Sequence, residues 1–345
     1  MTRRSVGGLL LVASALCAGV VRPDVAGADT PLVTRVHRYL MGTSMTIEVS
    51  GGDAASRTDV INEAFAAMVE IDRLMSNYRA DSELAAINAE AATRPVRVSD
   101  PMWSVLSAAQ LVSQRSAGAF DVTVGPLVRL WGFHDKKPHI PTAAELQRVR
   151  PLVGYQSLVL TPGAQTVAFA RRGVEIDLGG IAKGFAVEVA GGVLRRRGYA
   201  GMIDAGGNQY LVGHPVGKSA WQVGIEDPDQ PGGLLGVLSL ESGAVSTSGG
   251  YHNFFVARGK TYGHLLDPRS LRPSESSLSV TIVSPDATLA DALSKPAFIL
   301  GPVAGLKLVE SFPGTMAIIA TRKPGGGVNL VMSKPLLPRF RRTGS

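Results

Sequence analysis

The sequence carries its densest structural signal between residues 176 and 184, which read Ile176-Asp177-Leu178-Gly179-Gly180-Ile181-Ala182-Lys183-Gly184. This segment follows a short β-like stretch and opens a helix that we predict over residues 184–197. Glycines at such a junction let backbone N–H groups approach an anion, and a helix N-terminus adds positive potential. Lys183 could supply a further charge, and Asp177 could accept hydrogen bonds from a base or a ribose. A tight turn that needs small residues would show the same pattern, so spacing alone leaves both readings open.

Strand and helix signals on either side of this junction predict an α+β fold. Apolar residues at helical spacing predict helices over 57–75, 81–89, 101–116, 142–148 and 287–300. Alternating and β-branched segments predict strands within 33–49 and at 158–160, 166–169, 201–204, 209–212, 221–226, 235–240, 278–283 and 316–321. Because the two kinds of element do not alternate strictly, we expect mixed or antiparallel sheets with flanking helices. No convincing linker divides residues 34–333.

Composition excludes several classes of protein. The chain has 345 residues, of which 45% are hydrophobic and 18% charged, and this excludes a disordered, collagen-like or polytopic membrane protein. The single cysteine, Cys17, excludes an intrachain disulfide and a cysteine-bound metal cluster. The net charge of +7 raises the possibility of nucleic-acid binding. Since lysines and arginines do not cluster with alternating aromatic residues, we expect no nucleic-acid partner.

The N-terminus has the pattern of an export signal. Arg3 and Arg4 precede an apolar run from Val6 to Val21, and Ala26-Gly27-Ala28 fits a cleavage site. We therefore predict a signal peptide over residues 1–28, a domain over 29–333, and a basic, flexible tail over 334–345. The expected location is the periplasm or cell envelope, with membrane attachment only if the signal segment is retained. Sec and twin-arginine export both stay open.

Other clusters have both chemical and structural interpretations. Hydroxyls and glycines at 204–208 and 246–250 suit phosphate or sugar contacts, but for each cluster taken singly the pattern favours an ordinary turn. His264 could move protons near neutral pH, although a lone histidine is more often structural. Asp291 shares a helix face with Ser294 and Lys295, which suggests either a cation site or an Asp291–Lys295 salt bridge on a solvated face; spacing favours the salt bridge.

Taken together, these clusters resemble the ApbE family, the FAD:protein FMN transferases. The resemblance extends from about Tyr39 to Thr321 and rests on eight motifs in order. They are Met41-Gly42-Thr43; Ser76-Asn77-Tyr78 with Ser82-Glu83-Leu84 and Asn88; Gly118-Ala119-Phe120-Asp121 with Gly125-Pro126-Leu127; Asp177 to Gly184; Gly206-Gly207-Asn208; Ser246-Thr247-Ser248-Gly249; His264 to Arg269; and Ala290-Asp291-Ala292-Leu293-Ser294.

The resemblance implies a single α+β unit that cleaves FAD and passes FMN to a threonine hydroxyl of a partner protein, with Mg²⁺. The expected acceptors are flavin-carrying subunits of redox complexes. By motif position, FAD would contact Met41, Tyr78, Ala119, Phe120, Asp121, Asp177, Lys183 and Leu266. The backbone oxygen of Gly180 and the side chain of Asp291 would bind the metal, and we take His264 as the general base.

One position departs from the family pattern. The family usually carries threonine or serine four residues after the metal-binding aspartate, and this chain has Lys295 there. A protonated lysine has no lone pair to offer a metal. Three outcomes are open. The Lys295 side chain points away from the site and leaves a weaker Mg²⁺ site, or its ammonium group replaces the metal and neutralises the pyrophosphate. In the third outcome, the site holds FAD without transferring FMN. The alternative functions are therefore a non-catalytic FAD-binding protein or an FAD pyrophosphatase.

Overall fold

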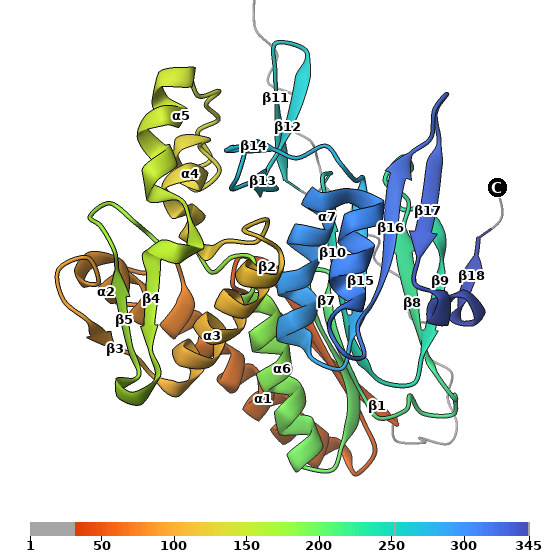
Figure 1. The fold of residues 1–345 in the computed structure, drawn as a ribbon. Coiled ribbons are helices and arrows are strands. Elements are labelled where there is room, and N and C mark those ends of the chain that lie inside the picture. Colours follow the sequence, from red (N-terminus) through yellow and green to blue (C-terminus); the bar gives the residue numbers. More distant parts are fainter. Residues whose placement is uncertain (1–31, 252, 344–345) are drawn as a thin grey trace, which may run out of the picture. The chain divides into compact units, whose positions relative to one another are not determined.

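The computed structural model describes residues 32–251 and 253–343, and the expected signal peptide over residues 1–28 lies outside them. Its centre is an eight-stranded sheet in the order β1-β2-β6-β7-β10-β15-β16-β17, in which every neighbouring pair is antiparallel (Figure 1). The strands are β1 (Val33–Leu40), β2 (Thr43–Ser50), β6 (Ala200–Ala205), β7 (Asn208–Val212), β10 (Gly243–Gly249), β15 (Ser279–Ser284), β16 (Met316–Arg322) and β17 (Val328–Met332).

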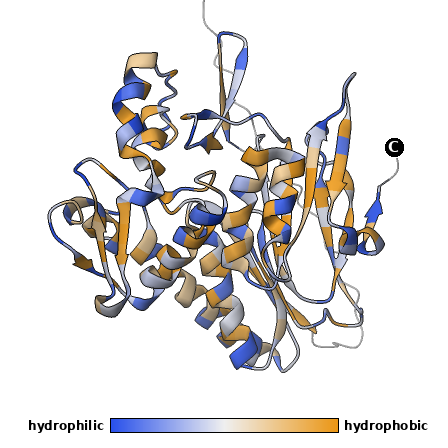
Figure 2. Cartoon of the chain, in the orientation of Figure 1, coloured by the Kyte–Doolittle hydropathy of each residue, from blue (hydrophilic) through white to orange (hydrophobic). Residues whose placement is uncertain are grey.

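Three helices cover one face of this sheet: α1 (Ala54–Met75), α6 (Ala182–Arg196) and α7 (Ala287–Glu310). The apolar residues of α1 are buried at the spacing that the sequence predicted. The main hydrophobic core lies between these helices and the sheet, and Figure 2 shows α7 and β16 as largely hydrophobic. Mixed helices and antiparallel strands confirm the predicted α+β class.

A smaller sheet lies against the central one. It contains β8 (Trp221–Glu226), β9 (Leu234–Leu240) and β18 (Phe340–Arg342), in the order β18-β9-β8. Buried and exposed residues alternate along β8, so one of its faces can pack on the central sheet. A second hydrophobic core joins the two sheets and includes Leu211, Val245 and Ile318 of the central sheet with Val223 and Leu238 of the smaller one.

The end of the chain corrects one expectation. Residues 334–342, expected as part of a flexible tail, form a 3-10 helix, η5 (Lys334–Arg339), and strand β18, which pairs with β9. Leu336 is fully buried in the second core and Phe340 packs against it. Two apolar side chains and the pairing of β18 with β9 thus join this segment to the smaller sheet.

The remaining described elements form two smaller groups. One contains α2 (Glu83–Glu90), α3 (Asp100–Arg115) and a sheet of β3 (Val96–Arg97), β5 (Thr166–Phe169) and β4 (Leu158–Thr161), together with the 3-10 helices η3 (Tyr155–Ser157) and η4 (Pro162–Ala164). The other contains η1 (Val122–Val124), α4 (Gly125–Leu130), α5 (Ala143–Val149), η2 (Arg150–Leu152) and the strand pairs β11 (Phe254–Ala257)–β12 (Lys260–Gly263) and β13 (Leu266–Asp267)–β14 (Arg272–Pro273). Trp131 and Leu266 lie in the hydrophobic cluster of this second group.

Helix α7 has the length and apolarity of a membrane span, alone among the helices in the described residues. It is interrupted at Gly301, whose φ of 76° is not helical, so the predicted helical end at Leu300 corresponds to a real break. Its first part lies in the main core. The apolar composition of α7 is accounted for by this burial.

Candidate active site

Ten of the predicted site residues come from segments far apart in the sequence and line one cavity of about 1220 Å³. They are Met41, Tyr78, Ala119, Phe120, Asp121, Asp177, Gly180, Lys183, His264 and Leu266. Lys295 also lines this cavity, whereas Asp291 is fully buried beneath it. The fold thus brings the predicted residues together, while what each of them binds stays a prediction.

The junction at 176–184 places the N-terminus of α6 at the cavity. The Asp177 carboxylate accepts a hydrogen bond of 2.7 Å from the backbone N–H of Gly179, and this closes the turn. Gly184 lies where α6 meets α7, and a β-carbon there would be 2.4 Å from the carbonyl oxygen of Ala287. Only glycine allows this approach. The turn therefore needs its small residues, as one interpretation of the junction predicted. It also directs the N-terminus of α6 toward the cavity, where anion binding stays a prediction.

Two ammonium groups lie at the end of the cavity next to the N-terminus of α6. Lys183 is in the first turn of α6 and has no hydrogen-bond or ion-pair partner within residues 32–251 and 253–343. Lys295 of α7 forms an ion pair with Asp291 and donates a hydrogen bond of 2.9 Å to the carbonyl oxygen of Asp291. Burial lowers the pKa of Lys295, the nearby charge of Lys183 lowers it further, and the Asp291 carboxylate opposes both.

The carboxylate of Asp291 is engaged at both oxygens. Oδ1 contacts the Lys295 ammonium, and Oδ2 accepts a hydrogen bond of 2.8 Å from the backbone N–H of Gly184. The expected salt bridge is therefore present, but it lies in the interior, with Asp291 fully buried and the Lys295 side chain 18% exposed, rather than on a solvated face.

These residues do not fit a magnesium ion. Mg²⁺ requires near-octahedral oxygen ligands at about 2.0–2.1 Å, and the Asp291 oxygen that would serve already holds an ammonium group. At an effective dielectric constant of about 20, a dication about 4 Å from that ammonium would be repelled by about 8 kcal/mol. We therefore assign no step of the chemistry to a metal ion.

The surroundings of His264 determine which ring nitrogen carries its proton. Nδ1 lies 2.9 Å from the carbonyl oxygen of Asn253, and the two residues also share a backbone hydrogen bond of 3.0 Å at the base of the β11–β12 hairpin. A carbonyl can only accept, so Nδ1 must donate. In the neutral ring, Nε2 then carries the lone pair, as a general base requires.

Tyr78 lies in the loop between α1 and α2, which is closed by its own hydrogen bonds. Its backbone N–H donates to Ser76 Oγ at 3.3 Å, and Ser82 Oγ donates to the carbonyl oxygen of Ser76 at 2.9 Å. Arg79 and Asp81 form an ion pair of 2.7 Å within the same loop. The loop presents the Tyr78 ring to the cavity with 75% of the residue exposed.

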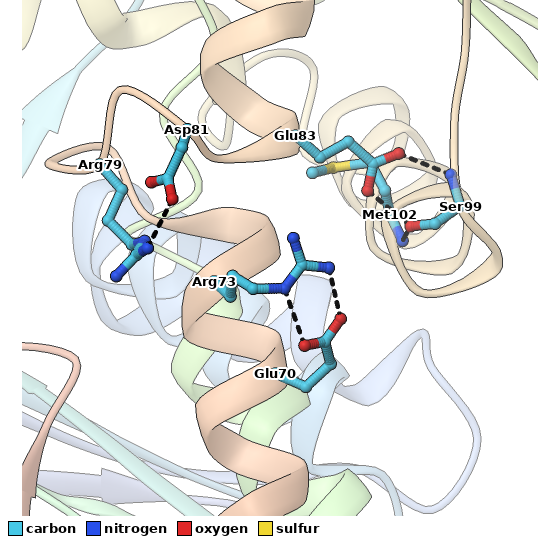
Figure 3. A network of polar contacts seen from close by, with 7 residues as sticks. All are labelled: Glu70, Arg73, Arg79, Asp81, Glu83, Ser99 and Met102. Atoms are coloured by element: carbon cyan, nitrogen blue, oxygen red, sulfur yellow. Dashed lines mark hydrogen bonds and ion pairs between the residues drawn. The ribbon is translucent and has the colours of Figure 1, made fainter.

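Figure 3 shows the polar contacts within this loop and in the helices beside it. Glu83, at the start of α2, accepts hydrogen bonds of 2.6 Å from both the backbone N–H and the hydroxyl of Ser99, the N-cap of α3. Arg73 and Glu70 pair in the last turns of α1 at 2.6 Å. Because α1 packs in the main core and α2 is hydrogen-bonded to the N-cap of α3, both ends of the loop that carries Tyr78 are held by the scaffold.

Sequence reasoning missed two residues of this site. The imidazole of His134 stacks on Tyr78 with the ring centroids 4.8 Å apart and an interplanar angle of 8°. Asn253 provides the carbonyl that orients His264. His134 directly follows the aromatic segment 130–133, which was the only hint of it in the sequence. Asn253 acts through its backbone, so its residue type gives no signal.

Asp121 is buried at the cavity wall and caps the 3-10 helix η1. Its Oδ1 accepts hydrogen bonds of 2.7 Å from both the backbone N–H and the hydroxyl of Thr123. Burial raises the pKa of Asp121 to about 6, and the hydrogen bonds from Thr123 limit the rise.

We expect the titration of the buried Asp121 carboxyl to lower the free energy of unfolding as the pH rises. Because the pKa is raised to about 6 in the folded chain, the folded state binds more protons than the unfolded state between about pH 4 and 6. Asp121→Asn keeps an oxygen for Thr123 and removes the titration. The free energy of unfolding of the wild type, relative to that of this variant, should fall by about 2 kcal/mol between about pH 4.5 and 7. Urea unfolding of both proteins at the two pH values measures this, and parallel pH profiles would contradict it.

Comparison with known proteins gives consistent matches over most of the chain. Residues 41–320 match the model of the ApbE family. The chain is similar to a FAD:protein FMN transferase of Treponema pallidum, with 32% identity over 306 residues, 82% of this chain and 84% of the relative. An ApbE protein of Thermotoga maritima superimposes with a TM-score of 0.81 at 32% identity, covering 90% of this chain and 100% of that one. The flavin transferase ApbE of Vibrio cholerae gives a TM-score of 0.80 at 29% identity, covering 89% and 99%.

Proposed function

The chain belongs to the ApbE family, and on this basis we propose that it transfers FMN from FAD to a hydroxyl group of an acceptor protein. The observation that carries the proposal is the single cavity that holds a cationic end, an aromatic ring and a histidine whose tautomer suits a base. The cationic end suits the doubly charged pyrophosphate of FAD, and the aromatic ring suits its planar flavin. The histidine can take the proton that the acceptor hydroxyl loses when FMN is transferred.

The reaction is a phosphoryl transfer. The acceptor oxygen forms a bond to the phosphorus on the FMN side, and the bond from that phosphorus to the bridging oxygen breaks. The hydroxyl proton passes to a base, and AMP leaves with the bridging oxygen. Negative charge develops on the transferred group, so donors that already point at that position lower the barrier.

The chain's own residues divide this work. Lys183 and the N-terminus of α6 neutralise charge on the pyrophosphate. His264 accepts the hydroxyl proton at Nε2, with Asn253 holding the ring in orientation. Met41, Ala119, Phe120, Asp121, Asp177 and Leu266 complete the FAD-binding surface.

Tyr78 offers the flavin ring a face on which to stack. Aromatic stacking contributes about 0.5–1.5 kcal/mol, so we expect Tyr78→Ala to weaken FAD binding by roughly two- to tenfold. Tyr78→Phe keeps the ring and should bind FAD like the wild type. Titration of FAD fluorescence measures both affinities. Equal losses in the two variants would show that the hydroxyl, rather than the ring, is what matters.

The acceptor and the compartment extend the same proposal. The hydroxyl is that of a threonine in a flavin-carrying subunit of a redox complex, as the family resemblance implies. The basic and apolar pattern of residues 3–28 supports export, with the reaction outside the cytoplasm. Peptide mapping of the modified acceptor identifies the residue, and cell fractionation tests the location.

Intact-mass spectrometry tests the function. The protein is incubated with FAD and an acceptor that the V. cholerae enzyme modifies in a parallel reaction. We expect an acceptor mass increased by that of FMN less one water, and one AMP released for each adduct. FAD bound without any product would identify a binding protein, and FMN and AMP without an adduct would identify a pyrophosphatase.

A further inference from the structure

We propose that the Lys295 ammonium takes the place of the divalent cation in this chain, so that FMN transfer proceeds without a metal ion at Asp291. The inference rests on the proposed function and adds to it the identity of the charge that faces the pyrophosphate.

The first observation is that the carboxylate expected to bind a metal holds the Lys295 ammonium instead. The Asp291 carboxylate contacts Lys295 at Oδ1 and is capped by Gly184 N–H at Oδ2. A β-carbon on Gly180 would lie 3.8 Å from Lys295 Cε, so the lysine side chain passes close to the backbone of Gly180. Both residues assigned to the metal therefore have Lys295 as a neighbour.

The second observation is that Lys295 can reach a ligand. Its side chain is 18% exposed and lines the cavity, while Asp291 beneath it is fully buried. Two of the three ammonium hydrogens are directed to the Oδ1 and carbonyl oxygens of Asp291. The third is left for a phosphate oxygen, because an ammonium group is a donor at all three hydrogens.

The third observation is the charge at this end of the cavity. Lys183 and Lys295 both lie beside the N-terminus of α6, and of these two side chains only Lys295 has an ion-pair partner within the described residues, which is Asp291. A pyrophosphate would give Lys183 and the positive end of α6 an anionic partner. Lys295 donates to an oxygen of the transferred phosphoryl as charge develops on it, while the proton of the acceptor goes to His264 and AMP leaves with the bridging oxygen. No metal enters this balance.

The activity test compares transfer rates with and without metal. After treatment with a chelator, the unmodified protein should flavinylate the acceptor at the same rate with EDTA as with added Mg²⁺. Lys295→Met removes the charge and should slow transfer by about 10²-fold under both conditions. Lys307→Met, on the exposed face of the same helix, is the matched control and should transfer like the wild type.

A second measurement does not depend on activity. Lys295→Thr restores the residue type that the family usually carries, so this variant with FAD should bind Mn²⁺, seen as loss of the free-ion signal in electron paramagnetic resonance. It should also become dependent on Mg²⁺ for transfer. The unmodified protein and Lys307→Thr with FAD should leave the Mn²⁺ signal unchanged. Thermal unfolding establishes that each variant is folded.

The outcomes separate this inference from the function on which it rests. Transfer that stops with EDTA and returns with Mg²⁺, or Mn²⁺ binding by the unmodified protein, keeps the function and overturns the role of Lys295. Absence of transfer under every metal condition, beside an active V. cholerae control, overturns the proposed function itself. If Lys295→Thr does not fold, the EDTA and Mn²⁺ results on the unmodified protein still decide.

Discussion

Replacing His264 with glutamine is expected to slow FMN transfer by about 10²–10⁴-fold and to leave FAD affinity nearly unchanged. The reason is that Nε2 is needed only when the acceptor hydroxyl loses its proton, whereas FAD is held by the rest of the cavity. Glutamine has similar reach and can hydrogen-bond, but it cannot take up a proton near neutral pH. Single-turnover transfer rates and FAD titrations measure the two effects separately.

His214 offers a matched control for this experiment. Its Nδ1 also lies near a backbone carbonyl, that of Ser219 at 3.1 Å, and it is exposed outside the cavity. His214→Gln should leave both transfer and FAD binding as in the wild type. A His264→Gln variant that transfers at the wild-type rate, or that loses FAD binding as much as transfer, would contradict the assignment of His264 as the base.

Replacing Asp291 with alanine is expected to lower the free energy of unfolding by about 3–5 kcal/mol. The change leaves the Lys295 ammonium and the Gly184 N–H without their partner in the interior. Combining it with Lys295→Met removes the unpaired charge, so the double variant should be more stable than Asp291→Ala alone. Urea unfolding of the two single variants and the double variant gives the coupling between these residues.

An exposed pair provides the comparison. Asp229 and Arg322 form an ion pair of 2.5 Å with partly exposed side chains, so Asp229→Ala should cost no more than about 1 kcal/mol. A loss at Asp291 as small as this would mean that the Asp291 carboxylate, which pairs with Lys295 within α7 and accepts from Gly184 of α6, contributes little to the packing of the two helices.

Sequence patterns predict many of the helices and strands of this fold because caps and apolar periodicity depend on residues close together in the sequence. Thr142 and Glu145 make the capping box that their spacing predicts. The apolar stripe of α1 is buried as expected. The C-terminal segment is different, because η5 and β18 depend on the distant strand β9, and nothing in a basic stretch reports that partner.

The sequence predicts which residues line the site, but it does not predict how their side chains are buried and oriented. Motifs in order identify the cavity lining, yet spacing cannot show that the Asp291–Lys295 pair is buried, since its burial comes from the close approach of α6 at Gly184. The tautomer of His264 depends on a backbone carbonyl at the base of a hairpin. The contact between Tyr78 and His134 joins two loops far apart in the sequence.

A crystal structure of the protein with FAD, grown with Mg²⁺ present, is the most direct test of this account. We predict the pyrophosphate at the N-terminus of α6, with a phosphate oxygen within hydrogen-bond distance of Lys295 Nζ and the flavin ring at Tyr78. A six-coordinate ion bonded to Asp291, or a pyrophosphate outside the cavity, would contradict the account.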